Sequence, residues 1–178
     1  MLNTRFWTVA GMILGAALTR LLPHPWNFTP IGAMALFSGA TFRDRRLAFV
    51  VPLATLFLSD LVIGLHFLMW AVYGSFALMV WLGTWLRARR RLWPIAATTL
   101  AGSVLFFVVT NFAVWLSGMT YPKTAAGLVA CYVAAIPYFG NTLAGDAFYV
   151  ALLFGGFAFA ERHVPALREP CDMIRHDA

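Results

Sequence analysis

The chain has 178 residues, of which 61% are hydrophobic and 11% charged, whereas soluble domains are about 45–50% apolar and about 25% charged. This composition excludes a disordered chain. So short a chain also cannot bury that much apolar surface in a water-soluble globule, which indicates that the solvent is lipid. The net charge is +6. Because the basic residues lie in short clusters between apolar runs, we expect them to orient the chain in a membrane, and we expect no nucleic-acid partner.

The first two predicted membrane spans flank a proline-rich loop. A spanning helix needs about 20 apolar residues. We expect Phe6–Leu22 to be a retained helix rather than a cleaved signal, because no convincing A-x-A site follows and Arg20 interrupts the place for one. The loop Pro23–Phe28 ends it, and Thr29 is predicted to cap the next helix, Pro30–Phe42. That second helix covers only about 20 Å, so a re-entrant segment is the alternative.

Four longer apolar runs complete a prediction of six spans: Leu47–His66, Phe67–Leu86, Leu92–Gly118 and Asn141–Ala160. The apolar stretch Thr124–Tyr138 is predicted not to span, since Pro137 interrupts it. We find no repeat and no linker. Residues 1–160 are therefore predicted to form one transmembrane domain, and residues 161–178 a cytoplasmic tail without a core of its own.

The distribution of basic residues supports this number of spans. With six helices, all but two of the thirteen Lys and Arg residues fall on one side of the membrane, and only Arg20 and Lys123 fall on the other. The shared side carries Arg5, Arg43, Arg45, Arg46, Arg87, Arg89, Arg90, Arg91, Arg162, Arg168 and Arg175. Basic loops stay in the cytoplasm, so we predict an all-α membrane protein with both ends cytoplasmic.

In this topology the polar side chains gather toward the outer side and form a polar, aromatic cup. Ionisable groups inside a membrane cost about 2.5–3.5 kcal/mol each and usually line a cavity or pair with a partner. Asp60 and Asp146 are therefore the strongest functional signals, although Arg20 or Lys123 could neutralise either one in a purely structural pair. The candidate substrate-binding residues are His24, Trp26, Asn27, Asp60, His66, Trp70, Tyr73, Asn111, Tyr121, Lys123, Asn141 and Asp146.

Other motifs are few. Gly11 and Gly15 are four residues apart, a spacing that lets a second helix approach closely, either inside the protein or from a partner. Cys131 and Cys171 have no CxxC spacing, so we predict neither a disulfide framework nor a metal site, and no cofactor. The sequence contains no G-x-S-x-G and no HExxH, and we predict no catalytic residues and no enzyme.

Several segments together resemble a bacterial family of uncharacterised integral-membrane proteins, over about residues 6–158. They are Asn27–Ala33, Leu36–Ala40, Leu58–His66, Tyr73–Phe76, Tyr121–Thr124 and Ile136–Asn141. That family is similar to the S components of energy-coupling-factor (ECF) vitamin transporters. The resemblance implies six helices in the bacterial cytoplasmic (inner) membrane that hold a vitamin-like solute near the outer surface. It also implies that Gly11 and Gly15 contact an ECF-type coupling subunit, which works with ATPases.

The resemblance further suggests the solitary S components that transport cobalamin without an ATPase module. In those proteins a cysteine of the fourth helix ligates cobalt. Here Tyr73 occupies that neighbourhood, and neither Cys131 nor Cys171 is placed to replace the cysteine. Cobalamin therefore matches the pattern incompletely, although an aromatic cup suits a large planar ligand.

Taken together, these patterns predict a substrate-capture membrane transport protein that takes up a small vitamin-like solute from the outer side. The alternative is a membrane scaffold or assembly partner without a small-molecule substrate, which contacts other proteins through its arginine loops and its first helix.

Overall fold

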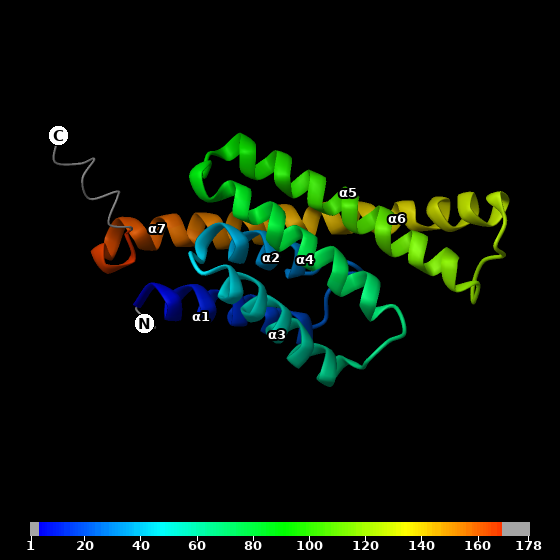
Figure 1. Ribbon diagram of the computed structural model, residues 1–178, viewed down its shortest axis with the longest axis horizontal. Coiled ribbons are helices and arrows are strands. Elements are labelled where there is room, and N and C mark those ends of the chain that lie inside the picture. The colour runs from blue at the N-terminus through cyan, green and yellow to red at the C-terminus, as the bar shows by residue number, and fades with distance from the viewer. Residues whose placement is uncertain (1–3, 169–178) are drawn as a thin grey trace.

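A computed structural model describes residues 4–168, and within that range the chain is helical and has no strands (Figure 1). The α-helices are α1 (Thr4–Leu18), α2 (Ile31–Thr41), α3 (Arg45–Ile63), α4 (Met69–Trp85), α5 (Leu92–Ser117), α6 (Ala125–Val150) and α7 (Gly156–His163). Short 3-10 turns follow three of them: η1 (Thr19–Leu21), η2 (Leu86–Ala88) and η4 (Pro165–Leu167). A five-residue π turn, η3 (Ala151–Gly155), joins α6 to α7.

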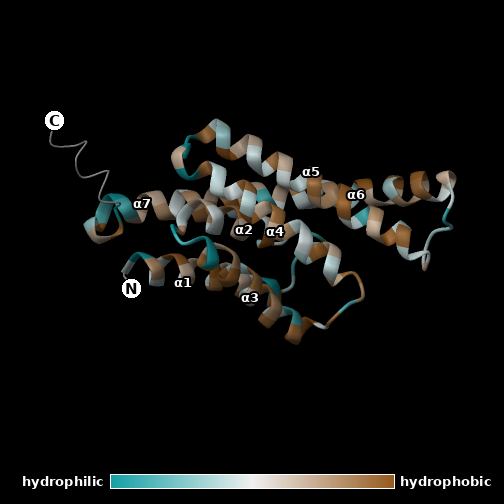
Figure 2. Cartoon of the chain, viewed as in Figure 1, coloured by the Kyte–Doolittle hydropathy of each residue, from teal (hydrophilic) through white to brown (hydrophobic). Residues whose placement is uncertain are grey.

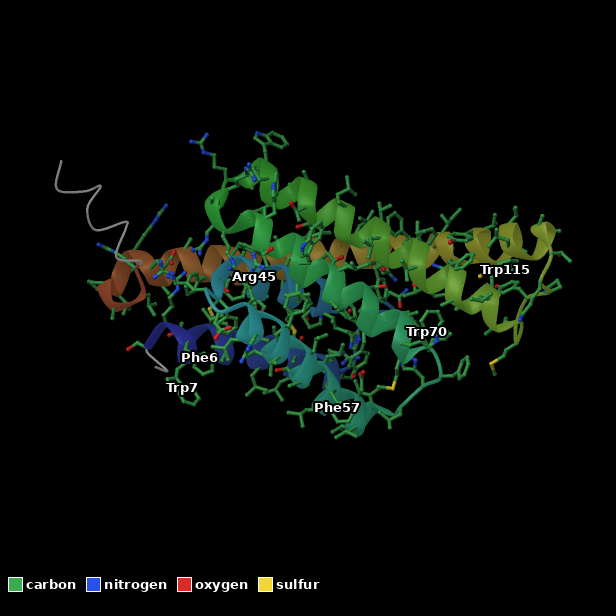
Figure 3. All side chains as sticks on the ribbon, in the orientation of Figure 1. Phe6, Trp7, Arg45, Phe57, Trp70 and Trp115 are labelled. Carbon is green, nitrogen blue, oxygen red and sulfur yellow. The ribbon has the colours of Figure 1, made fainter. Side chains whose placement is uncertain are left out.

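Four of these helical segments are long and apolar enough to cross a membrane: Arg45–Ile63, Met69–Ala88, Leu92–Ser117 and Ala125–His163. Large apolar side chains cover their outside, for example Phe57 and Trp70, which are 44% and 56% exposed (Figure 3). Soluble monomers rarely expose contiguous apolar surface of this extent. The chain is therefore a helical membrane protein, and hydrophobic residues occur along most of its helices (Figure 2).

The short helix α2 forms the centre of the molecule. All of its residues are buried, and it contacts α1, α3, α4, α5 and α6. At about 1.5 Å per residue it is only ~17 Å long, so its neighbours rather than lipid surround it. Pro30 stands at the N-cap without a side-chain cap bond, and the prediction that Thr29 caps this helix is wrong.

Glycines bring α2 and α4 into backbone contact. A Cβ on Gly39 would collide with the carbonyl oxygen of Val80, and one on Gly83 would collide with that of Leu36. Small residues allow such close helix crossings in membranes. Gly11 and Gly15, by contrast, are exposed, and a Cβ added at either residue would have no neighbour within 4 Å outside its own helix backbone. Internal packing is therefore not their role, and their contact with a partner helix stays a prediction.

The C-terminal half departs most from the sequence-based prediction. Helix α6, turn η3 and α7 form one continuous helix, Ala125–His163, of 39 residues, about 58 Å long. Pro137 lies inside it, so the separation of a non-spanning stretch, Thr124–Tyr138, from a helix Asn141–Ala160 is wrong. Thr124 starts the helix by accepting a hydrogen bond from the amide of Gly127, and membrane helices tolerate an internal proline better than soluble ones.

The remaining predicted helix limits need smaller corrections. Helix α3 starts at Arg45 rather than Leu47, because Asp44 caps it by accepting from the Arg46 amide at 2.7 Å. It ends at Ile63 because Gly64 has a φ of 124°. His66 therefore lies in the α3–α4 loop and not on a helix. Helix α5 agrees with the prediction to within a residue, with Gly118 in a left-handed conformation as its C-cap.

The arginine-bearing segments that were predicted to share one side do meet at one end of the molecule, which also holds the first described residues (Figure 1). Arg87 donates to the carbonyls of Gly39 and Arg43, and Arg90 donates to that of Ala40. Glu161 accepts from Arg5 at 2.9 Å and lies 3.5 Å from Arg90.

The predicted C-terminal tail is only partly a tail. Leu167, in the described part of this segment, accepts a hydrogen bond from Arg5 through its carbonyl oxygen, and its side chain is buried. Residues 161–168 therefore pack against the first helix, and the assignment of residues 161–178 as a cytoplasmic tail without a core of its own stays a prediction. Arg175 and the rest of the predicted tail lie outside the described residues.

Candidate functional site

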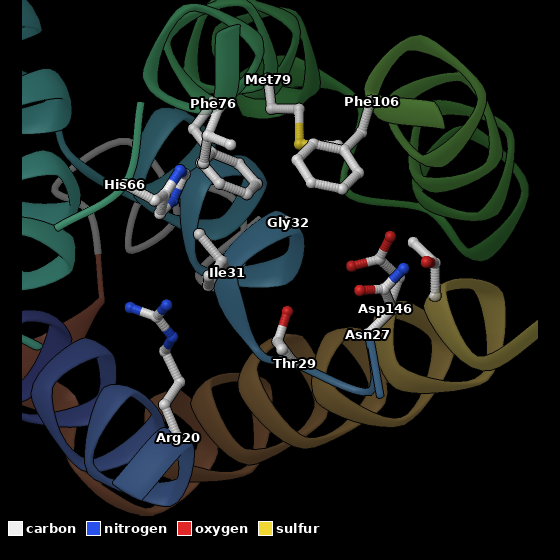
Figure 4. Close-up of a pocket in the computed structure, with 12 residues that line it drawn as sticks. Arg20, Asn27, Thr29, Ile31, Gly32, His66, Phe76, Met79, Phe106 and Asp146 are labelled. Carbon is white, nitrogen blue, oxygen red and sulfur yellow. The ribbon is translucent and has the colours of Figure 1, made fainter. Parts of the chain in front are cut away.

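A cavity of about 210 Å³ lies at the N-terminal end of α2, on the side of the molecule away from the cluster of Arg5, Arg87 and Arg90. Its walls come from η1, the loop before α2, the α3–α4 loop and helices α2, α4, α5 and α6, as Figure 4 shows. The lining residues are Arg20, Asn27, Thr29, Ile31, Gly32, His66, Val72, Phe76, Met79, Phe106, Thr142 and Asp146. Seven segments of the chain therefore converge on one space.

Two further cavities continue from this one between α5 and α6. The first, of about 260 Å³, shares Asn27, His66 and Thr142 with it and is also lined by Asn111. The second, of about 330 Å³, shares Asn111 with the first and reaches Tyr121 in the α5–α6 loop. These three spaces form a series of hollows from the centre of the molecule toward the tip of the α5–α6 hairpin.

Asp60 lies behind the wall of the central cavity, where two donors hold its carboxylate. Arg20 Nη1 donates to Asp60 Oδ1 at 2.9 Å and also to the hydroxyl of Ser59. The Tyr73 hydroxyl donates to the other oxygen of Asp60, at 2.8 Å. The Asp60 side chain is only 4% exposed. Asp60 therefore neutralises Arg20 and fixes its position on the cavity wall, which is the structural pairing that the sequence left open.

Asp146 is buried as deeply but lacks a counter-ion. The residue is 4% exposed and lines the cavity. Ser103 donates to its Oδ2 at 2.6 Å, and no other described residue donates to this carboxyl. A carboxylate in a low-dielectric site is costly unless it is paired. The Asp146 carboxyl therefore presents an oxygen, Oδ1, that is free to accept a donor from the cavity.

Gly32 makes room for that carboxyl. A Cβ on this residue would collide with Oδ1 of Asp146 and stand 3.1 Å from its Cγ. Because Gly32 is on the first turn of α2 and Asp146 is on α6, the absence of a side chain lets the acidic group lie directly against the central helix. Any larger residue at position 32 would displace the carboxyl from its place in the cavity.

The wall of the cavity formed by α4 and α5 is apolar. Phe76 on α4 and Phe106 on α5 stack with their ring centroids 5.2 Å apart and an interplanar angle of 20°. Met79 lies one turn along α4, beside the Phe106 ring (Figure 4). Aromatic faces carry a negative quadrupole and attract cations as well as apolar groups.

Of the candidate residues from the sequence, five line these hollows: Asn27, His66, Asn111, Tyr121 and Asp146. Asp60 and Tyr73 support the wall through Arg20 instead of facing the space. Asn141 donates to the carbonyl of Trp26 and thereby ties the loop before α2 to α6.

The remaining candidates point elsewhere. His24 and Trp26 are exposed on the loop, with Trp26 80% exposed, and Trp70 faces outward from α4. Lys123 lies against Gly118 in the α5–α6 loop, outside these hollows. These four residues do not line the hollows described here, and their role in binding a substrate stays a prediction.

Several site residues were missed by the sequence analysis. Arg20 was considered only as a neutraliser, and Ser103, Gly32, Phe76 and Phe106 were not considered as site residues. The sequence does not show which apolar side chains line a cavity, because the same residue types also face lipid on membrane helices. Thr142, one helical turn before Asp146, shares its face and was the one local signal available.

Comparisons with known proteins give a family but no activity. No curated protein and no solved structure matches the chain. The profile of DUF6580, a family of unknown function, matches residues 1–167. Because that match covers nearly the whole chain, the protein belongs to the family of unknown function DUF6580.

Proposed function

We propose that this protein is a substrate-capture subunit of the S-component type, which binds a small solute in the cavity between α2, α4, α5 and α6. The observation that carries the proposal is the Asp146 carboxyl, buried without a counter-ion on the wall of a cavity. Convergent polar groups on an otherwise apolar pocket are typical of small-molecule sites, and intramembrane carboxyls typically mark solute or ion paths.

Orientation follows from the arginine end. Because basic segments remain cytoplasmic, the cavity at the opposite end faces outward, toward the side from which a solute would enter. In this proposal six helical segments lie in the membrane, with α2 as a buried core helix, and both ends of the chain lie in the cytoplasm of a bacterium, at its inner membrane.

The size of the cavity limits the solute. At about 210 Å³, it is smaller than the ~300–1,000 Å³ of sites for drug-sized ligands. A solute much smaller than cobalamin fits the central cavity, and the two outer hollows would serve as its entrance. A vitamin-like molecule with a single small ring is therefore a better match than a large planar macrocycle.

Inward movement needs an element outside this site, because the cavity does not continue to the arginine end. The exposed Gly11 and Gly15 on α1 leave a flat strip where a helix of a coupling subunit could pack. The alternative function, a scaffold, would use the same strip together with the apolar α5–α6 hairpin, and needs no solute.

A purification experiment separates the two functions. The full chain, extracted in mild detergent, is subjected to mass spectrometry of small molecules released on denaturation. We expect a stoichiometric solute from the wild type, and at least tenfold less from Gly32→Ala, since a Cβ at this position displaces the Asp146 carboxyl.

The matched control is Gly140→Ala. Gly140 is also helical, but a Cβ added there would have no neighbour within 4 Å outside its own helix backbone. It should retain the solute as the wild type does. If the wild type releases only lipid, or if Gly32→Ala retains the solute while folding normally, the capture function is wrong and the scaffold function is favoured.

A further inference from the structure

The charges around the central cavity do not balance, and this imbalance specifies the kind of molecule that it accepts. Arg20 contributes one positive charge, and Asp60 and Asp146 contribute two negative charges. Because Asp60 forms an ion pair with Arg20 at 2.9 Å, the charge that remains belongs to Asp146. The side chains of Arg20, Asp60 and Asp146 therefore sum to a formal charge of minus one.

From this balance we infer that the cavity selects a small monovalent organic cation, whose protonated amine binds Asp146 and whose other end carries a neutral hydrogen-bond acceptor that faces Arg20. The inference rests on the proposed function and names its substrate class. One positive charge on the solute neutralises the site. A zwitterion would leave the complex negative, and an anion would place a second uncompensated negative charge in an apolar region, which is costly.

The geometry of the amine end supports this assignment. Ser103 occupies Oδ2 of Asp146 at 2.6 Å, while Oδ1 lies against Gly32, and both Gly32 and Asp146 line the cavity. The stacked rings of Phe76 and Phe106 form the neighbouring wall. An ammonium group binds favourably both to a carboxylate oxygen and to the face of an aromatic ring.

The opposite end of the cavity provides donors. Figure 4 shows Arg20 and Asp146 on opposite sides, with Thr29 and Ile31 between them. Arg20 uses Nη1 for Asp60 and Ser59, and no other described residue accepts from Nε or Nη2. These remaining N–H groups suit a carbonyl, amide or hydroxyl oxygen. They do not require an anion, because Asp60 already neutralises the guanidinium.

A matched series of probes that share one phenyl ring tests the inference. At about pH 6.5, below the pKa of about 7.7 that is usual for an α-amino group, L-phenylalaninamide is mainly a cation with a neutral acceptor and phenethylamine is a cation without one. At the same pH L-phenylalanine is a zwitterion, and 3-phenylpropanoate is an anion. Binding to the full chain in detergent is measured by calorimetry and by the shift in thermal unfolding. We expect affinity to fall in that order, with the loss of the acceptor weakening binding by about fivefold.

The variant Asp146→Asn keeps the size of the side chain but removes its charge, and should weaken L-phenylalaninamide binding by about 30-fold. Asp44→Asn is the matched control. Asp44 caps α3 at the arginine end, and an asparagine caps equally well, so this variant should bind as the wild type does.

The co-purified solute gives the second readout, so that a poor fit of the phenyl ring does not decide the result. A released solute with a basic nitrogen that Asp146→Asn loses supports the inference. A solute that is neutral or anionic, or that Asp146→Asn retains, overturns it while leaving the capture function intact. The absence of both a solute and probe binding contradicts the capture function itself.

Discussion

Two buried aspartates lie at the same end of this protein, and their surroundings give them opposite roles. Asp60, in the seam between η1, α3 and α4, accepts from Arg20 and Tyr73. Asp146, between α2, α5 and α6, accepts from Ser103 alone. A carboxylate that accepts from a counter-ion and from a hydroxyl stabilises the fold, whereas a carboxylate with an unused oxygen on a cavity wall is available to a ligand. Burial by itself does not distinguish the two, because both are almost fully buried.

The largest effect should come from breaking the Asp60 cluster. Asp60→Ala leaves the Arg20 guanidinium, 13% exposed, without its counter-ion, and losing one partner of a buried ion pair lowers the free energy of unfolding by about 3–5 kcal/mol. Equilibrium unfolding in mixed micelles measures this loss, with Asp44→Asn as the control for a surface aspartate. A loss below about 1 kcal/mol would show that the pair does not stabilise the fold.

A smaller effect is expected from removing one donor of that cluster. Tyr73→Phe deletes the hydrogen bond to Asp60 Oδ2 and should lower the free energy of unfolding by about 1–2 kcal/mol. Because Tyr73 does not line the cavity, solute retention should not change. Tyr132→Phe is the control, since its hydroxyl binds only a backbone carbonyl in an exposed position. Loss of the solute in Tyr73→Phe with unchanged stability would place Tyr73 in the binding site instead.

The smallest effect on stability should come from the second aspartate. Asp146→Asn removes a buried charge that has no counter-ion, so the free energy of unfolding should rise or stay within about 1 kcal/mol of that of the wild type. The same unfolding measurement tests this. A loss comparable to that of Asp60→Ala would mean that Asp146 has a structural partner, and the contrast between the two regions would then disappear.

The sequence predicted the helical class, most helix positions and the segregation of arginines to one end, because apolar periods and charge clusters are local signals. It also singled out Asp60 and Asp146 as candidate site residues, and both are buried. It misjudged Pro137, since the rule that proline ends a helix is weaker where neighbouring helices stabilise the chain. The sequence-based prediction also placed His66 on a helix, because the hydrophobic pattern does not reveal that Gly64 adopts a positive φ and ends the helix.

The site was harder to predict than the fold. His24, Trp26, Trp70 and Lys123 were included because polar and aromatic residues near a membrane interface resemble binding residues. Their depth could be inferred from the sequence, but the direction of each side chain depends on how the helices rotate against α2. Gly32 and Phe106 were missed for the same reason, since their roles exist only when α2, α5 and α6 are in contact.

The sequence alone determined that this chain resides in lipid, which of its ends is basic, and that two acidic groups lie within its hydrophobic segments. Only the tertiary structure decided which of them is neutralised, because ion pairs form across elements that are 40 residues apart, such as Arg20 and Asp60. It also decided that the shortest helix is the central one. Local composition determines whether a segment lies in lipid or in water, whereas tertiary packing determines which charged side chains form an ion pair.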